Sequence, residues 1–127
     1  MTWYVASIVS TIELLEEVQT EFPVFEDFYL FEAMSEPELK EKISKKILLI
    51  EAAGNCSLDG KPARQRCTGV RKTRSIYNSI EDDIDQSPPA DGAELTHSFF
   101  IAKSLDDAVL FSQGKRVTLD CVDDCDE

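Results

Sequence analysis

The chain has 127 residues, and 25 acidic against 13 basic side chains give it a formal net charge of −12. This length predicts a single domain over residues 1–127, large enough to bury a core without metal or disulfide crosslinks. The charge predicts long-range repulsion from nucleic acids and anionic membranes and favours basic or neutral partners. The longest apolar run spans only residues 47–50, and no signal peptide is visible, so we expect a cytoplasmic protein with no membrane partner.

The first half of the chain predicts two strands and a long helix. Residues 3–12 and 24–33 are rich in aromatic and β-branched side chains, and the short connection between them favours antiparallel pairing. Ser35 and Glu38 form a capping box, and apolar side chains recur behind it at helical spacing. These signals predict a helix over 36–52.

A basic segment follows the Asp59–Gly60 turn. Residues 60–74 hold six of the 13 basic side chains. A two-residue alternation predicts a strand over 64–77, with most of its charge on one side and a bend or bulge at Gly69. The basic residues of this segment are Lys61, Arg64, Arg66, Arg71, Lys72 and Arg74.

The second half adds an acidic loop, two strands and a short helix. The composition of residues 78–92 predicts the loop, and that of residues 92–103 predicts a strand. A short helix over 105–113 and a closing strand over 115–122 precede a frayed acidic tail at 123–127. The order β-β-α-β-β-α-β predicts the α+β class: a mainly antiparallel sheet of about five strands with one long and one short helix packed on a face.

Four short motifs spread over nearly the whole chain are Trp3-Tyr4-Val5-Ala6, Gly69-Val70, Asp91-Gly92-Ala93-Glu94-Leu95 and Ser104-Leu105-Asp106-Asp107. Together they resemble an uncharacterised bacterial family, domain of unknown function 4288. The resemblance implies a bacterial protein of one domain and adds nothing on mechanism, because no catalytic residue is established for the family. Trp3 and Glu94 are explained equally well as a core residue and a hydrogen-bond acceptor beside a turn. The acidic loop and the cysteine-bearing tail look like additions to the family pattern.

Few residues are suited to catalysis or to metal binding. His97 is the only histidine, and its place beside two phenylalanines is typical of a rim or core residue rather than of a base. Cys121 and Cys125 are spaced as half of a zinc site, but Cys56 and Cys67 do not form a second close pair. We expect reduced thiols, no metal, no cofactor and no catalytic residue.

Three interpretations of the basic strand stay open, in order of preference. It is a solvated face whose charge is met by neighbouring strands or by the acidic loop 81–91, a docking surface for a protein, or a nucleic-acid site. The last is disfavoured because stacking aromatics are missing. The side chains expected on the exposed side are Arg64, Arg66, Lys72 and Arg74. If the strand docks a partner, the contact residues are Arg64, Arg66, Arg71, Lys72 and Arg74.

The leading functional hypothesis is a non-catalytic protein-interaction module. An immunity- or antitoxin-like protein that binds a basic toxin domain is one form of it. The alternative is a small-molecule binder or an enzyme with a pocket near His97. Self-association into a homodimer is a third hypothesis, with the aromatic strand 24–33 as the seam between two copies.

Overall fold

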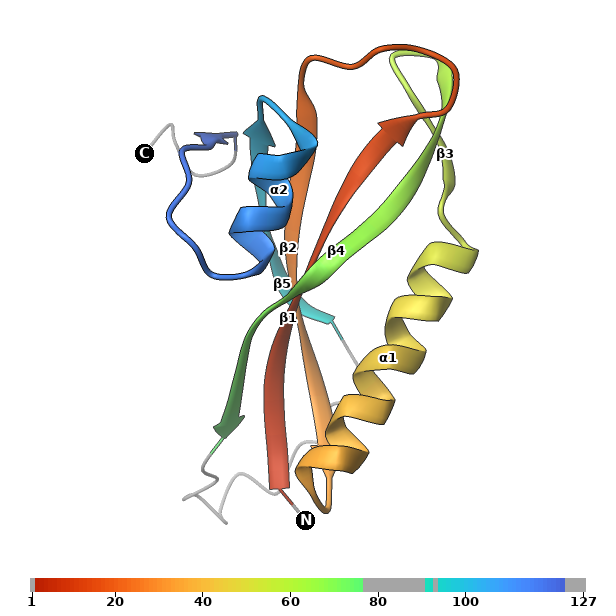
Figure 1. Ribbon diagram of the computed structural model, residues 1–127. Coiled ribbons are helices and arrows are strands. Elements are labelled where there is room, and N and C mark those ends of the chain that lie inside the picture. The colour runs from red at the N-terminus through yellow and green to blue at the C-terminus, as the bar shows by residue number, and fades with distance from the viewer. Residues whose placement is uncertain (1, 77–90, 93, 123–127) are drawn as a thin grey trace.

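The computed structural model describes residues 2–76, 91–92 and 94–122, which form one antiparallel sheet and two helices. The strands are β1 (Thr2–Leu14), β2 (Phe22–Ala33), β3 (Asn55–Leu58), β4 (Lys61–Ile76), β5 (Glu94–Ala102) and β6 (Asp120–Cys121), and the helices are α1 (Glu36–Ala52) and α2 (Leu105–Ser112). The sheet has the order β3-β4-β1-β2-β5-β6 (Figure 1). The predicted α+β class with a long and a short helix is therefore confirmed.

The described sheet has six strands rather than about five, because a short hairpin precedes the basic strand. Asp59 and Gly60 both have positive φ angles, 53° and 80°, which suits the tight turn of a two-residue hairpin. The turn folds β3 back onto β4. The closing strand, in contrast, is shorter than the predicted 115–122. Val117 and Leu119 pack against apolar residues of the sheet and α2, and only the two residues of β6 pair with β5.

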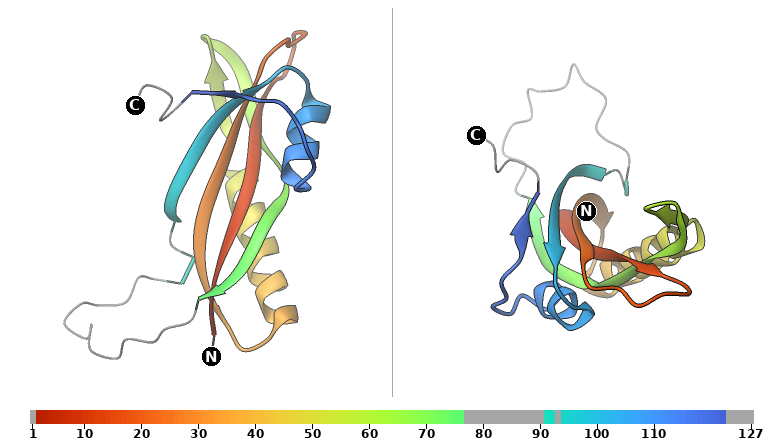
Figure 2. Two further views of the ribbon diagram at one scale, coloured as in Figure 1. Left: turned by 90° about the vertical axis from the view of Figure 1, so that its left-hand side faces the viewer. Right: turned by 90° about the horizontal axis from the view of Figure 1, so that it is seen from above.

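Each helix packs on a face of its own rather than both on the same one. Ala6 and Ile8 of β1 belong to the apolar cluster of α1, whereas Val9 belongs to the cluster of α2. Successive side chains of a strand point to opposite faces. Figure 1 shows α1 along the half of the sheet where β1 begins and α2 along the half where β1 ends. Each face is thus covered by a helix over only part of its length, and Figure 2 shows the same arrangement from two further sides.

Helix α1 has the predicted bounds, because its start is determined by local chemistry. The hydroxyl of Ser35 accepts a hydrogen bond from the backbone N–H of Glu38, and Pro37 occupies the tolerated first turn. Leu39 and Ile43 are buried against the sheet. Among the described residues, no helix is long and apolar enough to span a membrane.

The aromatic strand expected as a dimer seam is an interior strand. β2 pairs with β1 on one side and with β5 on the other, so its backbone hydrogen bonds are made within the chain. The outermost strands are β3 and β6, but β3 pairs only with residues 61–64 of β4, and β6 only with residues 100–101 of β5. Strand 24–33 therefore offers no free backbone edge to a second copy, whereas β3 and β6 leave most of the outer edges of β4 and β5 without a neighbouring strand among the described residues. Self-association stays a prediction.

Candidate functional site

The predicted basic strand is β4, and two bulges set the direction of its side chains. The pairing with β1 leaves Thr68 and Arg71 without an opposite residue, on either side of the predicted bend at Gly69. Each bulge reverses the sheet face to which the following side chains point, and two bulges together restore the original alternation. The residues that consequently share one face, as predicted, are Arg64, Arg66, Lys72 and Arg74.

At one end of this basic surface, Arg64 and Arg66 share a single acidic partner on the neighbouring strand β1. The guanidinium groups of Arg64 and Arg66 lie 3.7 and 3.4 Å from the same carboxylate oxygen of Glu13 on β1. Their side chains are 57% and 43% exposed, so each pair contributes less than about 1 kcal/mol. This agrees with the preferred interpretation of a solvated face.

Arg71 has a different role, because its bulge turns it under α2. Its guanidinium lies 3.4 Å from the carboxylate of Glu26 and stacks over the ring of Phe111 at 4.5 Å from the ring centroid. The Glu26 side chain is only 6% exposed. These contacts occupy Arg71 inside the molecule, which makes it the least accessible of the five predicted docking residues.

The other end of this surface, formed by Lys72 and Arg74, is not compensated by a described acidic side chain. Lys72 and Arg74 are exposed, and no side-chain ion pair joins them to another described residue. Asp91 is the one residue of the acidic loop 81–91 that the structure describes, and its carboxylate pairs with Lys42 of α1 rather than with β4 as expected. Residues 81–90 lie outside the described part of the chain.

A second group of polar side chains, which the sequence did not reveal, lies between β2 and β5. Asp27, Glu94 and His97 each place one potential ligand atom within 4.8 Å of the others, and we call them the acid–histidine cluster. Asp27 and His97 are directly opposite in the ladder. Glu94 reaches the same face because Leu95 is bulged out of the pairing. Without that bulge, residues three apart would point to opposite faces.

The cluster changes the acidity of its most buried member. Burial, a hydrogen bond with Glu94 and the negative charge of Glu94 together raise the pKa of Asp27 to about 7, against a smaller lowering by His97. A carboxyl group that titrates near neutrality beside an imidazole is suited to proton transfer. His97 itself is exposed and does not line a described groove. The described residues therefore place acid–base groups together at an exposed position.

Cys67, the thiol whose pKa responds to the charge of Asp27, does not provide a nucleophile. Cys56 and Cys67 are free thiols, and Cys125 lies outside the described residues. Burial, followed by the charges of Glu51 and Asp27, raises the pKa of Cys67 to about 12. A thiol with that pKa stays protonated at neutral pH and is a poor nucleophile.

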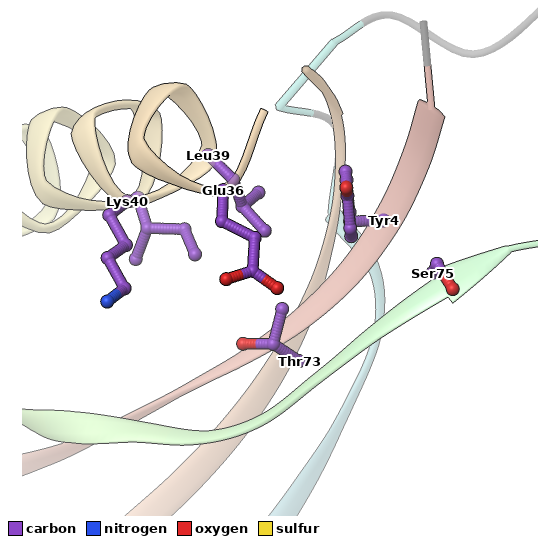
Figure 3. A pocket seen from close by; sticks show the side chains of 7 residues that line it. Tyr4, Glu36, Leu39, Lys40, Thr73 and Ser75 are labelled. Atoms are coloured by element: carbon purple, nitrogen blue, oxygen red, sulfur yellow. The ribbon is translucent and has the colours of Figure 1, made fainter. Parts of the chain in front are cut away.

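A groove of about 400 Å³ lies between the first turn of α1 and the end of β4. Figure 3 shows Glu36 and Lys40 on the helix side, with Thr73 and Ser75 on the strand side and Tyr4 on β1. Leu39 and Ile43 add apolar surface to these polar side chains, so the lining is of mixed character, and it contains neither histidine nor cysteine.

The connection between β1 and β2, residues 15–21, forms a projecting loop that we call the acidic tip. Gln19 holds it: its side chain accepts a hydrogen bond from the N–H of Leu14 and donates to two backbone carbonyl oxygens. Val18 is 93% exposed and Leu15 is 54% exposed. The flanking acidic residues are Glu16, Glu17 and Glu21. Polar composition alone predicted a connection here, but not its fixed conformation or its exposed apolar side chains.

Comparison with known proteins finds no match for this chain among family models, curated proteins or solved structures. The resemblance to domain of unknown function 4288 therefore stays a prediction, and the functional argument depends on the geometry of these surfaces.

Proposed function

We propose that the protein is a cytosolic protein-interaction module that binds a basic partner through the acidic tip. The observation that carries the proposal is Val18, which is 93% exposed on a loop held in one conformation. Loops on a rigid sheet commonly carry binding residues, and a preorganised loop loses less entropy on binding.

The surroundings of Val18 support a partner with positive charge and apolar side chains. Glu16 and Glu21 are exposed on the same loop. The carboxylate oxygen of Glu17 lies 2.6 Å from Nζ of Lys61 in the adjacent hairpin. The N–H of Leu15 also donates to the carbonyl oxygen of Pro62, which ties the loop to that hairpin. The net charge of −12 steers a basic protein toward this surface. An immunity- or antitoxin-like role is one form of this proposal.

The test is affinity capture from a lysate of the source organism, followed by binding measurements with the purified partner. The tip variant carries Leu15→Ser and Val18→Ser. The matched control carries Leu48→Ser and Leu49→Ser on α1, where both side chains are similarly exposed at 67% and 66%. We expect the tip variant to weaken binding at least about tenfold, because tenfold corresponds to about 1.4 kcal/mol and each of the two anchors should contribute more than about 1 kcal/mol.

Added salt should also weaken the association, because charge steering is screened. Binding that survives in the tip variant and is lost in the α1 control would place the interface on α1 and contradict the proposal. Failure to capture any protein at low or high salt would argue against the module function as a whole.

A further inference from the structure

The acid–histidine cluster lies on the sheet face that α1 covers, apart from the acidic tip. We propose that Asp27, Glu94 and His97 form a binding site for a divalent transition-metal ion, with Zn²⁺ as the best match. This site is independent of the proposed interaction module.

The ligand atoms of the cluster are already close together. One atom from each of the three side chains lies within 4.8 Å of the other two. A tetrahedral zinc ion with bonds of about 2.1 Å holds its ligand atoms roughly 3.4 Å apart. The backbone positions are set by the pairing of β2 with β5, and Glu94 and His97 are exposed. Small rotations of these two side chains therefore complete the coordination.

The charge of the cluster also favours a cation. Glu13, Glu17 and Glu26 each lie beside a basic side chain of β4. Asp27 and Glu94, by comparison, form no ion pair with a lysine or arginine of the described chain, although they are close enough to hydrogen bond to each other. A divalent cation compensates both carboxylates at once, which no described basic side chain does.

The donor atoms of the cluster distinguish between metal ions. An imidazole nitrogen with two carboxylate oxygens suits Zn²⁺, whereas Mg²⁺ and Ca²⁺ prefer oxygen ligands alone. Three protein ligands leave one position for water, as in open zinc sites. The sole histidine of the chain supplies the nitrogen.

The test uses Zn²⁺ alone and a protein in which all four cysteines are replaced by serine, so that thiols do not compete for the metal. Calorimetric titration near neutral pH should give one equivalent of bound Zn²⁺ that a large excess of Mg²⁺ does not displace. Asp27→Asn and His97→Gln should each weaken the affinity at least about tenfold, because losing a direct ligand costs no less than losing an outer-shell partner. Asp106→Asn, at an exposed position on α2, removes the same charge and should leave the affinity unchanged.

The single histidine allows a direct reading of the site by NMR. Addition of Zn²⁺ should shift the ring nitrogen signals of His97 in the cysteine-free protein, and Glu94→Gln should reduce that shift at equal metal concentration. Failure of the cysteine-free protein to bind Zn²⁺ would overturn the proposal. So would an affinity that Asp27→Asn and Glu94→Gln leave unchanged, or unaltered imidazole signals when the metal is bound.

Discussion

Glu26 and Asp27 are consecutive residues of β2, yet they lie in opposite environments. Glu26 points to the face covered by α2, is 5% exposed and meets the guanidinium of Arg71. Asp27 points to the other face, where it meets the carboxyl group of Glu94 and the imidazole of His97. One carboxylate is compensated by a cation of the same chain, and the other is placed beside a second acid.

This difference indicates that Glu26, rather than Asp27, has a structural role. A buried carboxylate with a paired guanidinium links α2, β2 and β4 and is occupied by those contacts. A partly buried carboxylate beside a second acid keeps a high affinity for protons or for cations. A buried carboxylate that is paired with a cation of the same chain thus indicates a packing role. A carboxylate that lacks such a cation indicates a candidate binding site.

The largest expected effect is on the Glu26 side of this comparison. Glu26→Leu leaves the guanidinium of Arg71 without its carboxylate and should lower the free energy of unfolding by about 3 kcal/mol. The double variant Glu26→Leu, Arg71→Leu should recover much of that loss, because neither charge then remains buried. Urea unfolding of the three proteins measures both effects, and equal losses in the single and double variants would contradict a pairing role.

On the Asp27 side, we expect a dependence on pH in the metal-free protein. The pKa of Asp27 is about 7 in the folded chain, above the ordinary value of 3.8, so the folded state holds this proton more tightly than the unfolded state. Stability should therefore fall as pH rises from about 4 to about 7 and level off above that range. Asp27→Asn removes this contribution and should flatten the curve.

Thermal unfolding of the wild type and of Asp27→Asn across this range, with a chelator present, measures the difference. Because Asp27 and Glu94 are coupled, the transition belongs to the pair. A difference between the two proteins that stays constant from pH 4 to pH 8 would show that Asp27 keeps an ordinary pKa.

The smallest effect is expected for the ion pairs of Glu13, because their arginine side chains are largely exposed. Arg64→Ser with Arg66→Ser removes both guanidinium partners of Glu13 and should lower stability by less than about 1 kcal/mol per pair. Chemical denaturation gives the change, and added salt should reduce the difference from the wild type. A loss as large as that of Glu26→Leu would show that burial does not determine how much these ion pairs contribute to stability.

Local signals in the sequence determined several elements correctly. The capping box at Ser35 and the apolar stripe behind it set helix 36–52, because a helix start depends on contacts within one turn. The Asp59–Gly60 turn and the two-residue alternation of the basic strand also depend on neighbours in sequence. The same local pattern correctly placed Arg64, Arg66, Lys72 and Arg74 on one face.

Only the tertiary structure decided which strands are neighbours, and the candidate site depends on that choice. Asp27 meets His97 because β2 pairs with β5, and Glu94 joins them because Leu95 bulges in that ladder. Likewise, Arg71 meets Glu26 through a bulge in the pairing of β4 with β1. Strand order and bulges follow from the packing of the whole sheet against two helices. Local patterns in the sequence do not specify these long-range pairings.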